Sequence, residues 1–391
     1  MDFATLALIG AVGLLGPLLA TPRRWHLPVT LGELVGGMVF GTSGLAVLEP
    51  ADPTFTFLAD IGFALVMFVA GSHVPVGDSR LRPALLGGVV RAALVGVCAA
   101  ALGVLIAHWF GTGHAALYGV LMASSSAALV LPAVESLRLG GPKVLSMIAQ
   151  VGIADTVCVV ALPLVIDPAH AGRAALSSAL VLAAVAVIFL VLRHFEISGA
   201  RRRLHRLSEH RRFALELRIS LILLFGLAAL ARWSHVSVLL AGFGLGLAVA
   251  LIGPPRRLAR QLFAVTEGFF GPLFFVWLGA SLDLRALVDH PSRIGLGAAL
   301  GLGAVIAHLV TRVAGAPISM GLLASAQLGV PVAAATLGTQ LGLLSPAEPA
   351  ALIVGALVTI AACALGGAAG ARAGLLAPAK DDAAPGADEA H

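Results

Sequence analysis

Apolar residues occur along the chain in thirteen long windows that are separated by short polar connections. Each window has about 17–25 residues, which is enough for a helix to cross a hydrocarbon layer of roughly 30 Å. The windows are 4–21, 28–48, 55–76, 83–108, 115–136, 142–166, 174–193, 216–232, 236–253, 262–282, 293–314, 318–343 and 347–370. The pattern therefore predicts an all-α polytopic membrane protein with about thirteen transmembrane helices.

The composition agrees with this assignment. Of the 391 residues, 59% are hydrophobic and only 12% are charged, which excludes an ordinary soluble enzyme. The mean hydropathy of +0.99 is also too high for a soluble domain with a single membrane anchor. Cys98, Cys158 and Cys363 lie far apart inside apolar windows, which predicts small buried side chains rather than a disulfide framework or a zinc site.

Positive charges are distributed unevenly between the two sets of loops. One set holds only four of the 25 Lys and Arg residues, namely Arg173, Arg232, Arg285 and Arg293. The positive-inside rule then predicts an N-terminus outside and a C-terminus in the cytoplasm, in the cell inner membrane. The basic stretch at residues 193–218 is typical of a loop facing anionic lipid, and we expect no nucleic-acid partner. Residues 371–391 lack periodicity, which predicts a disordered cytoplasmic tail.

Two similar strings indicate an internal repeat. LMASSS at residues 121–126 and LLASAQ at residues 322–327 are each followed by a proline, Pro132 or Pro331. The helix count gives the two strings opposite directions through the membrane, as in an inverted repeat. We therefore expect one half at 1–166, a linker helix with a basic loop at 167–215, and a second half at 216–370. Small residues and serines followed by proline also predict broken helices that line a cavity.

Ionisable residues inside the windows lie mostly within two turns of a helix end, where their side chains can reach water. These are Glu33, Arg91, Glu135, Glu267 and Arg312 on the cytoplasmic side, and Asp60 and Arg232 on the outer side. Asp155 is the exception, because it lies about 13 residues, or roughly 20 Å of helix, into its window. A carboxylate at that depth needs a proton or a cation, so Asp155 is the predicted ion and proton site.

The Ser124, Ser125 and Ser126 cluster supplies candidate oxygen ligands, together with carbonyl groups freed where the helix breaks. Close helix packing is the alternative interpretation of these serines. Thr156, beside Asp155, faces another side of its helix and would join the site only if the helix unwinds locally. Gln327 is interpreted as a bridge between helices, and His308 as a packed histidine rather than a proton relay.

Four segments resemble sequence patterns of a known family. They are TLGELVGGMVFGTSGL at 30–45, LADIG through FVAG at 58–71, and the stretches 124–135 and 270–283. In that order they are similar to LGEIxxGxxxGPSxLG, LAEIGxxxLxFxAG, SSTAxVLxxLEE and PxFFxxxGxxxD. These patterns belong to the second monovalent cation:proton antiporter family, the Kef and Nap type. The resemblance covers nearly the whole membrane part and indicates a short form without a cytosolic regulatory domain.

The resemblance implies the sodium/proton antiporter fold, with thirteen helices, two inverted-topology repeats and crossed broken helices five and twelve. It also implies a homodimer formed through a panel of helices, and a mobile core that carries the ion. Asp155 falls on the family's ion-binding aspartate. The chain departs from the family by having Ala154 before that aspartate, Ser281 where some electrogenic relatives have Lys, and Ala326-Gln327-Leu328 in the twelfth helix.

These observations predict a secondary active antiporter that exchanges Na⁺ or K⁺ for H⁺ by alternating access, without a cofactor and without enzymatic activity. With Ala154 and Ser281 in place of ionisable groups, Asp155 is the one titratable group expected at the midplane, which predicts electroneutral exchange. The alternative is a carrier of organic anions on the same inverted-repeat fold, which would use the positive ends of broken helices. An intramembrane aspartyl protease would need a second central carboxylate.

Overall fold

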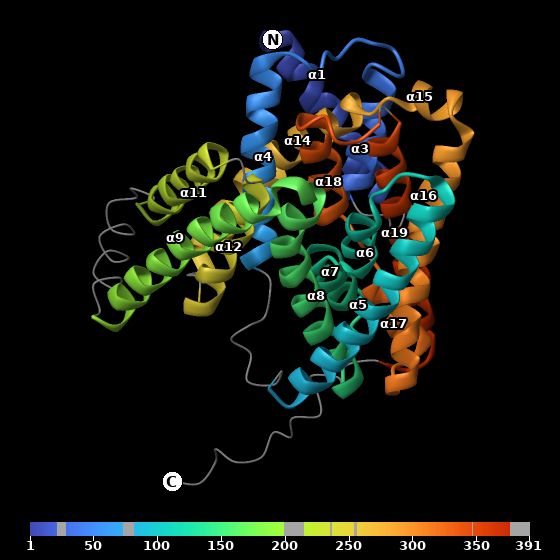
Figure 1. Cartoon of the computed structure of the whole chain (residues 1–391). Coiled ribbons are helices and arrows are strands. Elements are labelled where there is room, and N and C mark those ends of the chain that lie inside the picture. The colour runs from blue at the N-terminus through green and yellow to red at the C-terminus, as the bar shows by residue number, and fades with distance from the viewer. Residues whose placement is uncertain are drawn as a thin grey trace.

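The computed structural model describes residues 1–21, 29–72, 82–198, 215–234, 237–253, 256–345 and 347–375. Within these ranges every regular element is helical (Figure 1). The elements are α1 (Phe3–Gly13), α2 (Leu15–Ala20), α3 (Val29–Phe40), α4 (Pro53–Ser72), α5 (Arg82–Phe110), α6 (Ala115–Ala123), α7 (Ala127–Ser136), α8 (Pro142–Ile166), η2 (Pro168–His170), α9 (Ala171–Ile197), α11 (Leu215–Trp233), α12 (Val238–Ile252), α13 (Arg256–Val265), η3 (Thr266–Phe270), α14 (Gly271–Ser281), α15 (Leu284–Asp289), α16 (Pro291–Leu309), η4 (Val310–Ala314), α17 (Ile318–Ala324), α18 (Gly329–Gln340) and α19 (Glu348–Arg372).

The helices reproduce the predicted spans. Nine helical segments of the described chain are long and apolar enough to cross a membrane, and Phe3–Leu19, Val29–Phe40 and Val238–Ile252 are shorter apolar helices. The 19-residue α11 is the remaining predicted span. Several spans are divided, as where α6 and α7 together form one span at Ala115–Ser136. The expectation of about thirteen transmembrane helices is confirmed.

Two predicted segments fall largely outside the described ranges. Of the basic stretch at 193–218, residues 199–214 lie outside them, and its two ends belong to α9 and α11. The tail prediction also lies outside them from residue 376 onward, although α19 continues to Arg372, two residues into the predicted tail.

The helices pack into two groups (Figure 1). The panel consists of α1–α4 and α11–α14, in which α3 packs on α14, and α4 on α12 and α14. The crossover bundle consists of α5–α8 and α16–α19, in which α5 packs on α6 and α8, and α19 on α16, α17 and α18. The long α9 contacts α12 of the panel and α8 of the bundle. Each group draws on both halves of the sequence.

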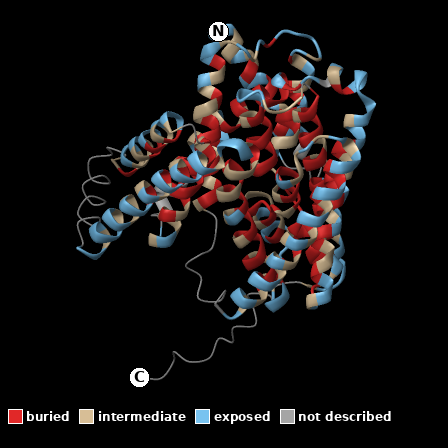
Figure 2. Cartoon of the chain, in the orientation of Figure 1, coloured by how far each residue is buried: buried red, intermediate tan, exposed pale blue. Residues whose placement is uncertain are grey.

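Burial places the broken helices at the centre and α9 at the edge. In the window that contains α17 and α18, 78% of the residues are buried, whereas only 11% are buried in the window that contains α9. Figure 2 shows the same contrast, with exposed residues along α9 and buried residues through the middle of the main helix assembly. Since the exposed α9 residues include Leu176, Val187 and Leu190, this surface is suited to lipid.

Glycines allow the panel helices to approach backbone to backbone. A Cβ atom at Gly279 of α14 would lie 2.1 Å from the Leu34 carbonyl oxygen of α3, and one at Gly37 would lie 2.2 Å from the Val276 carbonyl oxygen. No side chain fits at such a distance, so only glycine permits this crossing. Beyond the end of α3, the Thr42 and Ser43 hydroxyls donate hydrogen bonds to the carbonyl oxygens of Ala280 and Leu282.

A buried carboxylate fastens one end of the crossover bundle. Glu348, at the start of α19, is only 2% exposed and accepts a hydrogen bond from the Tyr118 hydroxyl of α6 at 2.6 Å. Its carboxylate also lies 2.7 Å from His114 Nδ1, and it accepts weaker bonds from the amide and hydroxyl of Ser345. These bonds join the start of α6 to the connection between α18 and α19.

Candidate functional site

Two of the spans in the crossover bundle are interrupted near their middle. In the first, α6 ends at Ala123 and α7 begins at Ala127, with Ser124 and Ser126 in extended conformations between them. In the second, α17 ends at Ala324 and α18 begins at Gly329. The predicted breaks at 124–126 and 325–327 are confirmed. Each break leaves backbone N–H and C=O groups without helical partners.

The two breaks lie against each other and are joined by reciprocal hydrogen bonds. The Ser125 hydroxyl donates to the Ala324 carbonyl oxygen at 2.6 Å, and the Gln327 amide donates to the Ser124 carbonyl oxygen at 3.2 Å. The backbone N–H of Gln327 donates in turn to the hydroxyl of Thr359 on α19. The side chain from each break thus binds the backbone of the other, so Gln327 acts as the predicted bridge between helices.

Asp155 projects from α8 to the start of α7. Its side chain is buried, and Oδ2 accepts a hydrogen bond from the backbone N–H of Ala127 at 3.0 Å. That N–H is a free donor at the positive end of α7, which favours a negative charge on the carboxylate. Within the described ranges no basic side chain forms an ion pair with Asp155, so a bound cation or a proton is left to complete its charge balance.

His308 of α16 lies next to the same junction and is fully buried. Its Nε2 atom is 3.1 Å from the Ser125 hydroxyl, and its Nδ1 atom is 2.9 Å from the Ala304 carbonyl oxygen. Since a carbonyl oxygen only accepts, Nδ1 carries a hydrogen. A neutral ring then has a bare Nε2, which competes with the Ala324 carbonyl oxygen for the single Ser125 hydrogen. Protonation at Nε2 removes that competition.

The remaining predicted site residues are distributed as follows. The Ser124 hydroxyl donates to Leu121 and the Thr156 hydroxyl to Gly152, each within its own span, and the Ser281 hydroxyl donates to Leu278 at the end of α14. Ser126 directly precedes α7, and its side chain caps no N–H of that helix. In the part of the chain that the structure describes, none of these side chains forms a hydrogen bond with Asp155, so their role in binding stays a prediction.

Sequence reasoning did not place three features of this junction. It named neither the Ala127 N–H nor the Thr359 hydroxyl, and it interpreted His308 as packing. A backbone donor has no sequence signal except the break itself. His308 did carry a signal, because a histidine inside a span has to find a polar partner. The identity of that partner depended on the helix rotation.

We predict that Ser125→Ala destabilises the crossover bundle. The change leaves two buried atoms, the Ala324 carbonyl oxygen and His308 Nε2, without the Ser125 hydroxyl beside them. Because buried polar atoms without partners are costly, we expect the free energy of unfolding to fall by about 1–3 kcal/mol. Thermal unfolding of the purified protein in detergent measures the effect. Ser136→Ala is the matched control, because the exposed Ser136 hydroxyl only bonds Ala133 of its own helix. Equal unfolding temperatures for the two variants would contradict the prediction.

Comparison with known proteins decides the family. The profile of the family described as "Sodium/hydrogen exchanger, transmembrane" matches residues 9–366 of this chain. The chain belongs to the sodium/hydrogen exchanger family. It is therefore a multi-pass membrane protein, and the resemblance seen in the sequence motifs is confirmed.

Curated relatives of this exchanger-family chain carry names that refer to Na⁺/H⁺ antiport and to potassium efflux. It is 23% identical to "Putative Na(+)/H(+) antiporter YjbQ" of Bacillus subtilis, over 91% of this chain and 61% of the relative. It is 28% identical to "Glutathione-regulated potassium-efflux system protein KefC" of Cronobacter sakazakii, over 74% of this chain and 46% of that protein. The chain thus spans about half to three fifths of the length of these relatives.

Solved structures of an exchanger share the fold. The chain is similar to the sodium proton antiporter MjNhaP1 from Methanocaldococcus jannaschii, with a TM-score of 0.64 at 14% identity over 96% of this chain and 97% of that one. A second structure of that antiporter, at pH 8, has a TM-score of 0.59 at 16% identity, over 91% of this chain and 94% of that one. At this level of identity the likeness establishes the sodium/proton antiporter fold alone.

Proposed function

We propose that the protein exchanges a monovalent cation, Na⁺ or K⁺, for H⁺ across the cell membrane. The observation that carries the proposal is the position of Asp155, a buried carboxylate bonded to the start of α7 at the junction of two broken helices. A single carboxylate without a basic partner holds either a cation or a proton, but not both. Mutual exclusion at one group links the two ions and produces exchange.

Oxygen atoms at the α6–α7 break complete the proposed cation site. Asp155 is the shared ligand, and the Ser126 hydroxyl and the backbone carbonyl groups of Ser124 to Ser126 directly precede Ala127, whose N–H binds Asp155. Ser124, Ser125 and Thr156 join the cation if their present hydrogen bonds exchange during binding. Gln327 and Ser281 have supporting roles.

The proposed movement is alternating access between the two helix groups. The crossover bundle carries the site, and the panel, packed through its glycines, forms the fixed surface. In this proposal two copies of the chain form a homodimer through their panels, with the N-terminus outside and the C-terminus in the cytoplasm. The inverted-repeat halves at 1–166 and 216–370, joined by the linker at 167–215, supply one broken helix each.

An organic-anion carrier is less well supported by the site. Such a carrier needs an unoccupied positive helix end, but the Ala127 N–H at the start of α7 already binds the Asp155 carboxylate. That carboxylate would repel a substrate anion at the same place. The geometry therefore favours a cation and a proton as substrates.

Proton flux in proteoliposomes tests the proposal. A pH gradient is set across the membrane, and Na⁺, K⁺ or choline is then added while a pH-sensitive dye reports the lumen. We expect Na⁺ or K⁺ to dissipate the gradient and choline to leave it unchanged. No response to any monovalent cation would overturn the proposed function, and the responding ion defines selectivity.

We predict that the exchange is electroneutral, with one proton for one cation. If Asp155 alone changes its occupant, the loaded site is neutral in both cases and moves no net charge. A membrane potential, worth about 2.3 kcal/mol per charge per 100 mV, then leaves the equilibrium unchanged. Transport in liposomes clamped at several potentials with valinomycin measures this. A reversal point that moves with voltage would indicate that a second group, Glu135, Glu267 or His308, titrates during the cycle.

A further inference from the structure

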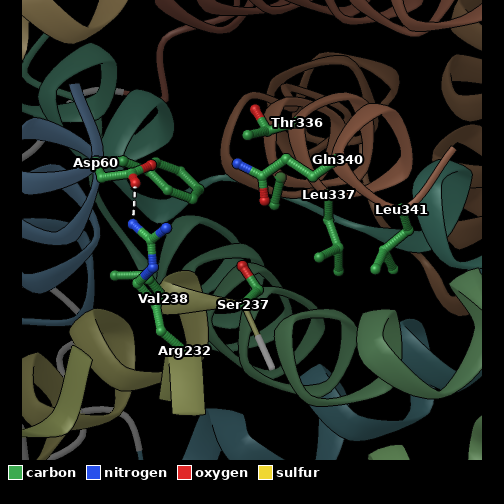
Figure 3. Close-up of a pocket in the computed structure, with 10 residues that line it drawn as sticks. Asp60, Arg232, Ser237, Val238, Thr336, Leu337, Gln340 and Leu341 are labelled. Atoms are coloured by element: carbon green, nitrogen blue, oxygen red, sulfur yellow. Dashed lines mark hydrogen bonds and ion pairs between the residues drawn. The ribbon is translucent and has the colours of Figure 1, made fainter. Parts of the chain in front are cut away.

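A cavity lies between the panel and the crossover bundle, away from Asp155. Its volume is about 180 Å³, and it is bounded by α4, by the end of α11, by the start of α12 and by α18. Figure 3 shows Asp60 and Arg232 on the panel side, facing Thr336 and Gln340 of α18 across the space. The cavity thus has one wall from each helix group. In alternating access one group moves against the other, so the shape of such a cavity changes during transport, as an ion path requires.

Asp60 and Arg232 are the only charged residues among the described residues that line this cavity. The Arg232 guanidinium donates to Asp60 Oδ2, joining α11 to α4. The Asp60 side chain is 18% exposed and the Arg232 side chain 61%, so the pair is partly solvated. The charges balance in the cavity, and removal of either one leaves the other unopposed.

The rest of the lining offers uncharged polar groups. The Ser237 hydroxyl oxygen already accepts a bond from the Leu239 N–H but keeps its own hydrogen to donate. The buried Thr336 hydroxyl has no hydrogen-bond partner within the described ranges, and the Gln340 side chain is exposed to the cavity. Hydroxyl and amide oxygens of this kind suit a small cation that keeps part of its hydration shell.

The helix α4, which lines the cavity, also packs against the second helix break. Along α4, Asp60 is followed two turns later by Met67, whose sulfur and methyl carbon lie 3.4 Å from a Cβ placed at Gly329. Gly329 is the first residue of α18 and directly follows the break that contacts Ser124. The flexible Met67 thioether therefore packs at the start of α18, two turns along α4 from the Asp60 carboxylate of the cavity.

We propose that this cavity is an entry chamber for small monovalent cations on their way to the crossover, and that the Asp60–Arg232 pair sets its affinity for them. The assignment of the passing ion rests on the proposed antiport function. The electrostatic role of the pair is argued from the lining residues alone, and it can be measured without a transport assay. The Asp60 carboxylate attracts cations to the chamber and the Arg232 guanidinium repels them, so removal of one partner should change the cation affinity in the opposite direction from removal of the other.

Thiol labelling tests the chamber directly. A Gln340→Cys reporter is introduced after the native cysteines are replaced by alanine, and its reaction rates with a cationic and an anionic methanethiosulfonate are compared in nanodiscs. The ratio of the two rates should rise about fivefold in Arg232→Gln and fall about fivefold in Asp60→Asn, because one charge becomes unopposed. Arg232→Lys keeps the charge and should leave the ratio unchanged. Val288→Cys, at an exposed position on α15, is the control reporter.

The same variants are then assayed for cation-driven proton flux. Arg232→Gln should lower the KM for the cation and Asp60→Asn should raise it, each by about threefold, with little change in kcat, since Asp155 is untouched. The proposed chamber would be contradicted if the two charge-removing variants did not shift the labelling ratio in opposite directions. It would also be contradicted if the cysteine at position 340 did not react. Shifted labelling with an unchanged KM would also overturn it as an ion entry site. Absence of flux in the wild type, with labelling as expected, would instead be a failure of the proposed function.

Discussion

Asp155→Asn is expected to reduce cation-driven proton flux to the level of liposomes without protein. Asparagine keeps the size of the side chain, and its amide oxygen can still accept the hydrogen bond from the Ala127 N–H. It holds neither a proton nor the negative charge that binds a cation, so the exchange has no carrier. The variant should remain folded, which size-exclusion chromatography and thermal unfolding in detergent will establish.

The matched control is Asp289→Asn, the same chemical change at an exposed position near the end of α15. Its flux should equal that of the wild type. Binding of the cation itself, followed by calorimetry, should be lost in Asp155→Asn and kept in the control. Flux at the wild-type rate in Asp155→Asn would remove Asp155 from the mechanism and move the search to His308, a buried titratable side chain that bonds Ser125 at this junction.

Gly279→Ala is expected to prevent the panel from packing. The added methyl carbon would lie 2.1 Å from the Leu34 carbonyl oxygen and 2.9 Å from the Met38 backbone nitrogen, and neither backbone atom can move without its helix. The α3 and α14 helices must separate, at a cost of about 3 kcal/mol or more in the free energy of unfolding. We expect a sharply lower yield of monodisperse protein and a lower unfolding temperature.

A second glycine provides the comparison. A Cβ at Gly226 of α11 meets no atom within 4 Å, so Gly226→Ala adds the same methyl group in open space. It should leave yield and unfolding temperature unchanged or slightly improved, because alanine favours helix over glycine. If the two variants behave alike, the close crossing of α3 and α14 is not what stabilises the panel.

The spans were predictable from the sequence because lipid leaves the backbone few options. A segment in hydrocarbon has to form its hydrogen bonds internally, so length and hydropathy alone locate its helix. The breaks were predictable for a related reason, since the strings LMASSS and LLASAQ and the following Pro132 and Pro331 weaken the helix at places that only a polar cavity tolerates. Asp155 stood out because a carboxylate in mid-span is costly unless it holds a proton or a cation.

The contacts between spans were not predictable in the same way. Asp60 and Arg232 each lie close enough to a helix end to reach water alone, and only the packing of α11 on α4 brings them together. The pairing of His308 with Ser125 likewise depends on the rotation of α16 about its axis. Hydropathy fixes how deep a residue lies in the membrane but leaves its direction around the helix open, and packing decides that direction.

The glycine crossing of the panel also constrains how the chain is assembled during synthesis. The hydrogen bonds from Thr42 to Ala280 and from Ser43 to Leu282 join residues 238 and 239 positions apart. At about 5–20 residues per second, a ribosome needs roughly 10–50 s to produce α14 after α3 has entered the membrane. For that interval α3 presents its glycine face to lipid or to the insertion machinery. The panel therefore closes late in translation, after the first broken helix has been in the membrane for some time.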